Sequence, residues 1–247
     1  MLQIMKKFFV SFSLLIITTS LFCQNGLYFS VGYLFDTYLY IDPLVKGIND
    51  FNAVKLNQGM LVEKEMKTPG IFTGLVIGMK SNINFSNINF DIIHSRFRAS
   101  AKGTDSLFNS YYEKINVGIV GMTINYSLNL INTDYFRMGP GLGLQLVQCR
   151  MYVRNDISYG TSAYEKPVNN FLMSGDIRFP ISIGGEKFMF DIVPYYVYPF
   201  WKPNSTVFYQ EMNYSMSEIY ESQNPIKFNT QRWGISFTLN FKLNIED

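Results

Sequence analysis

Cysteine and histidine are almost absent from this chain. Its 247 residues include two cysteines and one histidine, His94. One cysteine, Cys23, lies in an N-terminal segment that we expect to be removed, and a single remaining cysteine cannot form an internal disulfide. So few nitrogen and sulfur ligands argue against a transition-metal site, and the chain carries no GxSxG, Walker A, HExxH or CxxC motif. The sequence therefore predicts no metal, no cofactor and no catalytic residue.

Charged residues are also scarce, at 16% of the chain, against about 25% in soluble domains. There are 21 Lys and Arg and 19 Asp and Glu, and setting aside Lys6 and Lys7 leaves 19 of each sign. A chain with balanced charge and no basic run lacks the features of a nucleic-acid-binding protein. Aromatic residues, in contrast, reach 17%, which fits a partly lipid-facing surface with tyrosine-rich rims.

The N-terminus contains an apolar run that is too short for a transmembrane helix. Positions 8–22 hold 15 residues, whereas a spanning helix needs about 20. Lys6 and Lys7 precede this run, and small polar residues lie near its end. This order of a positive region, an apolar region and a cleavage zone is that of a secretory signal peptide.

Cleavage between Cys23 and Gln24 is expected, so that 1–23 is a signal peptide and 24–247 is one mature domain. Signal peptides that end before a glutamine resemble those of Bacteroidetes-type bacteria. A lipidated Cys23 is the alternative. The residue before it, Phe22, is larger than the small residue that a lipobox requires at this position.

Eight segments carry large apolar residues at every second position, the pattern of a β-strand with one apolar face. The clearest example is 113–130, in which Val120, Met122 and Ile124 alternate with smaller residues. Each segment is long enough to cross a bilayer as a tilted strand. The eight expected strands are 27–40, 70–80, 88–99, 113–130, 135–154, 169–183, 187–201 and 231–243.

The connections between these segments alternate between long and short. Bacterial outer-membrane barrels have short periplasmic turns and long extracellular loops. We therefore predict an all-β fold: an eight-stranded antiparallel up-and-down transmembrane β-barrel with short periplasmic turns and long extracellular loops. No helix of three turns is expected. The connections are 41–69, 81–87, 100–112, 131–134, 155–168, 184–186 and 202–230.

The second face of the strands carries Gly, Ser, Thr and Asn, with few charges. A soluble lipocalin-like barrel buries its apolar face and presents charged residues to water. Small residues suit a crowded lumen instead, so we expect the apolar face to meet lipid. The soluble lipocalin-like carrier is kept as an alternative.

Two irregularities are expected within the strands. The apolar phase of 88–99 shifts between Ile92 and Ile93, which we interpret as a β-bulge. Four prolines fall inside expected strands, and because proline donates no ladder hydrogen bond they must lie at bulges or rims. These prolines are Pro140, Pro180, Pro194 and Pro199.

With these features the chain resembles the small eight-stranded outer-membrane barrels typified by the OmpA transmembrane domain, and among them the PorT-like barrels of Bacteroidetes. The resemblance rests on the signal ending before Gln24, the alternation of loops and the aromatic last strand from Trp233 to Phe241. It differs from full-length OmpA in having no periplasmic peptidoglycan-binding domain. Phe241, moreover, is followed by further residues, 242–247. The resemblance implies a bacterial outer-membrane location.

Charged residues on the small face should pair inside the lumen, because buried charges need partners. Folding 184–186 into a tight hairpin sets Arg178 opposite Val193 and diagonal to Asp191. The 131–134 turn similarly places Arg137 beside Asn129. We interpret the cluster as a structural plug in the periplasmic half, with a proton or ion path as the alternative. The expected cluster consists of Arg137, Asp176, Arg178 and Asp191.

His94 is expected on the luminal face together with Arg96 and Arg98, as part of the same charged interior. Barrel enzymes such as lipid A deacylases place a His and a Ser two positions apart, on one face. Here Ser95 directly follows His94, so the two side chains point to opposite faces. We therefore assign His94 no catalytic role, and a lipid-modifying barrel enzyme is kept as the runner-up.

The predicted function is a structural or interaction role in the bacterial cell envelope. The expected surroundings are outer-membrane lipid and an envelope or extracellular protein, contacted through loops 41–69 and 202–230, because loops on a rigid scaffold commonly carry recognition. A narrow pore is a further alternative.

Overall fold

The computed structural model of the protein describes residues 26–40, 42–57, 59–83, 85–104, 110–157, 164–165, 168–206 and 227–243. The expected signal peptide, 1–23, lies outside these residues. Within the described ranges, no helix has both the length and the apolar character needed to cross a membrane.

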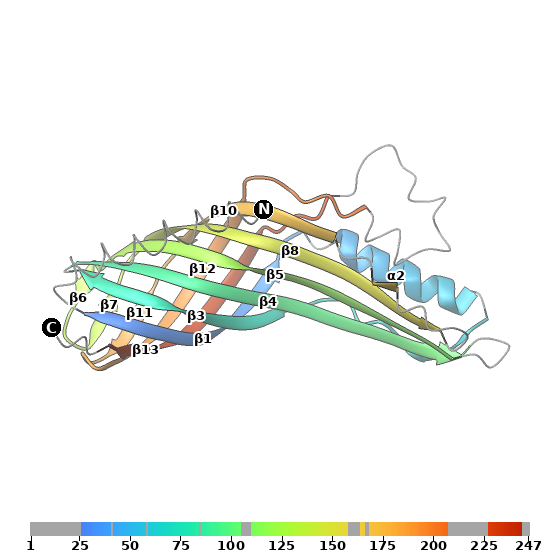
Figure 1. Ribbon diagram of the computed structural model, residues 1–247, viewed down its shortest axis with the longest axis horizontal. Coiled ribbons are helices and arrows are strands. Elements are labelled where there is room, and N and C mark those ends of the chain that lie inside the picture. The colour runs from blue at the N-terminus through green and yellow to red at the C-terminus, as the bar shows by residue number, and fades with distance from the viewer. Residues whose placement is uncertain are drawn as a thin grey trace.

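Eight long strands of the described chain close into an antiparallel ring (Figure 1). The last strand pairs with the first, from Tyr28 opposite Lys242 to Tyr38 opposite Arg232. The expected eight-stranded up-and-down barrel is thereby confirmed. In ring order the strands are β1 (Leu27–Tyr38), β3 (Phe72–Ile83), β4 (Ser86–Thr104), β5 (Ser110–Leu128), β8 (Gly141–Ile157), β10 (Val168–Arg178), β12 (Phe188–Pro199) and β13 (Arg232–Lys242).

Five short strands complete the described sheet. β7 (Phe136–Met138) precedes β8, β11 (Ile181–Gly184) follows β10, and β7 and β11 pair with each other. β6 (Ile131–Asn132) pairs with β7, β2 (Leu61–Lys64) with β4, and β9 (Tyr164–Glu165) with β8. We call the end of the barrel that carries β6, β7 and the β11–β12 turn the turn end, and the opposite end the helix end.

The four prolines lie where the ladder tolerates them. Pro140 separates β7 from β8, and Pro180 separates β10 from β11. Pro194 lies opposite the second break, where its carbonyl accepts a hydrogen bond from the Phe179 N–H at 3.0 Å. Pro199 is the last residue of β12. Since proline cannot donate to a ladder, two of the expected strands are each divided in two.

One helix, α2 (Asp42–Asn57), corrects the expectation that no helix of three turns is present. It has 16 residues and lies in the connection 41–69. Strands β4, β5 and β8, with 19, 19 and 17 residues, project beyond the others at the helix end, and α2 runs alongside them (Figure 1). Leu44, Ile48 and Phe51 are buried against the sheet. In the sequence this segment has few apolar residues and therefore reads as a polar loop. Its helix is stabilised mainly by packing against the sheet, which the local pattern does not reveal.

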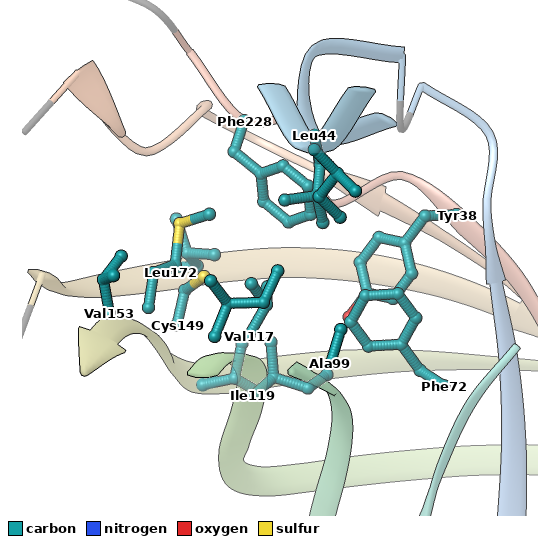
Figure 2. Close-up of a cluster of buried hydrophobic side chains, with 14 of the residues drawn as sticks. Tyr38, Leu44, Phe72, Ala99, Val117, Ile119, Cys149, Val153, Leu172 and Phe228 are labelled. Atoms are coloured by element: carbon teal, nitrogen blue, oxygen red, sulfur yellow. The ribbon is translucent and has the colours of Figure 1, made fainter. Parts of the chain in front are cut away.

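The barrel interior has an apolar part at the helix end and a polar part toward the turn end. Figure 2 shows Leu44 of α2 and Phe228 above side chains from the long strands, among them Val117 and Cys149. Below this core the inward side chains are Ser, Thr, Asn and charged residues, most of them buried. The small inward face therefore fills the lumen, as expected for a ring of eight strands.

The outward face of the ring is apolar, with large exposed side chains on every long strand, from Phe29 on β1 to Phe241 on β13. The expected β-bulge is wrong, because β4 keeps continuous register with β3 and β5 through Ile92 and Ile93. Ile92 is 52% exposed and faces outward, whereas Ile93 is 7% exposed and faces the lumen. The apparent change of phase reflects an apolar interior at this height and not an extra residue.

Candidate functional site

A chain of buried polar contacts crosses the lumen from β10 and β8 to β13 and β1. On β10, Arg178 donates through Nε to Asp176 Oδ1 at 2.7 Å and through Nη2 to Oδ2 at 2.9 Å. Gln145 Nε2 on β8 donates to Asp176 Oδ2 at 3.0 Å, and Gln145 Oε1 accepts from Arg232 Nη2 on β13 at 2.7 Å. One glutamine on β8 thus links a carboxylate of β10 to a guanidinium of β13, two strands that do not pair with each other.

The same contacts continue to the first strand. Arg232 Nε lies 3.2 Å from Asp36 Oδ1 on β1, and the Tyr195 hydroxyl on β12 donates to the same oxygen at 2.7 Å. A further Arg232 nitrogen, Nη1, donates to the Thr230 carbonyl at 3.3 Å. We call this set the luminal network: Arg178, Asp176, Gln145, Arg232, Asp36 and Tyr195.

A second buried pair lies nearer the turn end. Lys80 Nζ on β3 is 2.7 Å from Asp191 Oδ2 on β12, and it also donates to Ser182 Oγ on β11 at 2.9 Å. Both charged side chains are almost completely buried. A buried ion pair holds only with good geometry and additional hydrogen bonds, and here the serine supplies one of them.

Asp91 on β4 adds a fourth carboxylate to this polar region. Its Oδ2 accepts from Asn125 Nδ2 at 3.1 Å and from the Thr123 hydroxyl at 3.5 Å, both on β5. A cavity of about 30 Å³ lies beside Asp91, Arg178 and Arg232. That volume holds about two waters, so the polar side chains around it are closely packed.

The luminal charges of the polar part toward the turn end balance, with Glu113 buried apart from them at the helix end. Arg137 belongs to them, because it pairs with inward-facing Ser182 across the β7–β11 ladder, and residues directly opposite share a face. With it, four carboxylates face four cations, which lowers the cost of burying them. They are Asp36, Asp91, Asp176 and Asp191, and Lys80, Arg137, Arg178 and Arg232.

The structure brings together only part of the expected cluster. Asp176 and Arg178 form an ion pair, but Asp191 pairs with Lys80 and not with Arg178. Arg178 lies opposite Tyr195, two residues from the expected Val193. The β11–β12 hairpin begins at Gly184 opposite Met189, so its turn is wider than the assumed 184–186.

The expected position of Arg137 is also corrected. It lies opposite Asn132 on β6 and Ser182 on β11 and not beside Asn129. The 131–134 connection is not a tight two-strand turn, because β6 and the break at Pro140 occupy this region. Among the described contacts, Arg137 forms no ion pair with the other members of the expected cluster.

The luminal placement of His94, Arg96 and Arg98 is wrong. All three side chains are exposed on the outward face of β4. The error follows from the assumed bulge: without it, Ile93 and Ser95 face inward and the residues between and beyond them face outward. The sequence reading therefore placed three exposed cationic or titratable residues inside the barrel.

Asp36, Lys80 and Arg232 were missed, although the signal for them was present. Each stands on the small-residue face of its expected strand, in phase with inward glycine, serine or threonine residues. Listing every charge on that face would have found them. Their pairing would still have stayed open, because it depends on the order in which distant strands meet.

No model of a known protein family matches the chain, and a search of curated proteins finds no match. Among solved structures, Neisserial surface protein A is 12% identical, with 88% of this chain and 97% of that protein covered and a TM-score of 0.41. Ail of Yersinia pestis is 9% identical over 89% and 100% of the two chains, with a TM-score of 0.36. The N-terminal β-barrel domain of Pseudomonas aeruginosa OprF is 8% identical over 89% and 98%, with a TM-score of 0.36. These values are too low to support an inference about function.

Proposed function

We propose that this protein is an outer-membrane β-barrel with a closed lumen and a structural or interaction role in the bacterial cell envelope. The observation that carries the proposal is the combination of an apolar outward face and a charged, paired interior. A soluble barrel has the reverse arrangement. The long outward side chains, such as Leu142 and Phe171, would be stable in lipid and costly in water.

The membrane location is tested by fractionation and by gel mobility with and without heating. We expect the protein in the outer-membrane fraction, and a shift in mobility on boiling, because a closed barrel resists detergent until heated. Recovery of an unshifted protein in the periplasm would support the lipocalin-like alternative instead. N-terminal sequencing of the same material tests cleavage before Gln24 and distinguishes it from lipidation of Cys23.

A closed lumen is supported by the luminal network and by the apolar core under α2, which lie one above the other. Purified protein in a planar bilayer should conduct no more than a protein-free bilayer. Arg232→Ala should raise the frequency of opening, whereas Lys202→Ala, at an exposed position near the helix end, should not. Steady conductance of the unmodified protein would favour the narrow pore.

The geometry around His94 supports a role without catalysis. His94 lies opposite Leu75 on β3 and Val120 on β5, and its neighbours two positions away on β4 are Ile92 and Arg96. None of these is a nucleophile or an acid, and Ser95 points into the interior. A general base needs its nucleophile within hydrogen-bond reach. Lipid-modifying activity in the purified protein that is abolished by His94→Ala would establish the enzyme alternative.

In this proposal a protein partner contacts the helix end. The connection 41–69 presents the exposed side of α2, including Lys46 and Asn49. Most of the other expected loop, 202–230, lies outside the described residues. Cross-linking through a cysteine introduced at Lys46, compared with one at Lys187 on the turn end, tests which end is contacted. Membership of the PorT-like barrels of Bacteroidetes is part of this proposal. It would be supported by relatives that have the same order of signal peptide and barrel domain.

A further inference from the structure

Basic residues gather on the outward face of the three long strands, at the level where the apolar surface ends. Arg96 and Arg98 on β4 and Arg150 on β8 are exposed, and Lys114 on β5 is half-buried. Two more lysines lie on and just after β2, which pairs with the far end of β4. We call these residues the basic patch: Lys64, Lys67, Arg96, Arg98, Lys114 and Arg150.

The lower boundary of the patch is a straight row across three strands. His94 on β4 lies opposite Val120 on β5, which lies opposite Gln148 on β8. One step toward the turn end, the outward row is apolar throughout: Ile92, Met122 and Leu146. One step toward the helix end, the row is Arg96, Gly118 and Arg150. On β4 and β8 the outward side chain therefore changes from apolar to cationic over two outward positions, while β5 has Gly118 in the cationic row.

The six cations of the patch outnumber the nearby carboxylates, which include the exposed Glu65 between Lys64 and Lys67. None of its six cations forms an ion pair with a carboxylate among the residues that the structure describes. The nearby Glu63 instead pairs with Lys102 at 2.8 Å, and Glu113 is buried on the inward face of β5. Like charges on neighbouring strands repel, so the arrangement costs stability unless an anion occupies it.

The surface between these cations is hollowed. A cleft of about 210 Å³ is lined by Lys64, Lys67, Arg98 and Lys114, together with Ser100 and Tyr112. Lys64 Nζ donates to Ser100 Oγ at 2.9 Å, which holds the lysine at the rim.

Arg96 and Arg150 flank Gly118 on the middle strand, so no side chain lies between the two arginines in this row. A Cβ at Gly118 would come within 2.7 Å of the Ser95 carbonyl oxygen and 3.1 Å of the Arg96 Cβ, so this close approach of β4 and β5 favours glycine. Gln148 Oε1 accepts from Arg150 Nε at 2.9 Å and Nη2 at 2.7 Å, which orients the guanidinium. Guanidinium groups held in this way suit the bidentate recognition of phosphate oxygens.

We propose that the basic patch binds the phosphate groups of an anionic glycolipid in the outer leaflet. Its position favours a lipid over a soluble polyanion, because the patch faces sideways and begins where the apolar belt ends, at the depth of the lipid headgroups. Cations at that depth attract anionic headgroups. This inference rests on the proposed membrane location and adds a ligand class to it.

The test measures lipid retained by the folded barrel. Purified protein is incubated with bisphosphorylated lipid A in detergent, washed, and assayed for bound lipid. The first variant is Arg96→Gln/Arg98→Gln/Arg150→Gln. The matched control, Lys46→Gln/Lys187→Gln/Lys202→Gln, removes the same charge from exposed positions outside the patch. Heat-dependent gel mobility shows for each variant that the barrel is folded.

We expect the first variant to bind lipid A roughly 100-fold more weakly, since each cation near an anionic surface contributes about fivefold. The control variant and the unmodified protein should bind alike, and enzymatically dephosphorylated lipid A should bind as weakly as lipid A does to the first variant. Equal retention by all three proteins, or of both lipids, would overturn the proposal.

A soluble polyanion distinguishes the two sources of phosphate. Inorganic polyphosphate should compete poorly with lipid A at equal phosphate concentration; if it alone binds, the patch is not a lipid site. A barrel that fails to shift on heating and does not insert into vesicles refutes the membrane location itself. A barrel that inserts but retains no lipid A refutes only the site.

Discussion

Arg232 on β13 and Asp36 on β1 form a buried ion pair across the seam where the last strand meets the first. Nε lies 3.2 Å from Oδ1, and each side chain is 1% exposed. The two residues are 196 positions apart in the chain. They can therefore meet only when the ring closes, and the pair directly links barrel closure to the luminal network.

Removal of the Arg232 side chain should strongly destabilise the closed barrel. Arg232→Ala leaves Asp36 buried without its cation, a change that costs about 3–5 kcal/mol. Urea unfolding of the barrel in detergent micelles, followed by tryptophan fluorescence, measures the loss. Lys242→Ala is the control, because its partner Glu186 is largely exposed and such pairs contribute about 1 kcal/mol or less. A similar small loss for both variants would show that the seam does not depend on this pair.

The ring of strands was predictable from the sequence, whereas the filling of its interior was not. Alternation is a local signal, so the long strands were found with ends displaced by a few residues, as in 113–130 against β5. The helix α2 was missed because its stability comes from contacts with distant strands. The inward and outward faces of β4 were assigned wrongly around Ile93 and Ser95. The interior is apolar at the helix end, so both faces of β4 carry apolar residues there.

The charge network shows the same limit. Asp176 and Arg178 are two apart on one strand, and their pairing follows from local geometry. Asp191 meets Lys80 from a strand 111 positions away, and no short-range pattern encodes that contact. A two-residue error in one hairpin was enough to move the expected partner, because register sets every cross-strand neighbour at once.

Removing one partner of the Lys80–Asp191 pair should lower the free energy of unfolding more than replacing both partners with apolar residues. Lys80→Met alone leaves the Asp191 carboxylate buried without its cation, at a cost of about 3–5 kcal/mol. The double variant Lys80→Met/Asp191→Leu removes both charges and should recover most of that loss. Urea midpoints of the two single variants and the double variant form a double-mutant cycle. If the loss of stability in the double variant equals the sum of the losses in the two single variants, the two side chains are not energetically coupled.

Replacing Gly74 with alanine should destabilise the barrel, whereas replacing Gly70 should not. A Cβ built on Gly74 in β3 falls 1.8 Å from the His94 carbonyl oxygen of the neighbouring strand, whereas one built on Gly70 meets nothing within 4 Å. Because the obstacle is backbone, Gly74→Ala must shift β3 against β4, at a cost of about 1–3 kcal/mol. The yield of heat-shifted barrel after refolding, compared with that of Gly70→Ala, measures the effect. Equal yields would mean that the two strands separate without cost.

Docking of α2 should control access to Cys149, which is buried beneath it on β8. Leu44 is completely buried in the same cluster (Figure 2), and Leu44→Ala should weaken docking by about 2–5 kcal/mol. The ring itself should stay closed, because its ladders do not involve the helix. Alkylation of Cys149 in the folded, heat-shiftable protein should accelerate, with Cys23 replaced by serine if it is retained.

The matched control for this experiment is Lys46→Ala, at an exposed position on the same helix. It should leave the alkylation rate unchanged, because Lys46 lies outside the cluster and alanine favours the helix. Acceleration in Leu44→Ala alone would show that α2 opens and closes over the interior without unfolding of the barrel. Equal rates in both variants and in the unmodified protein would mean that the thiol is reached by another route, and that the helix does not seal this end of the lumen.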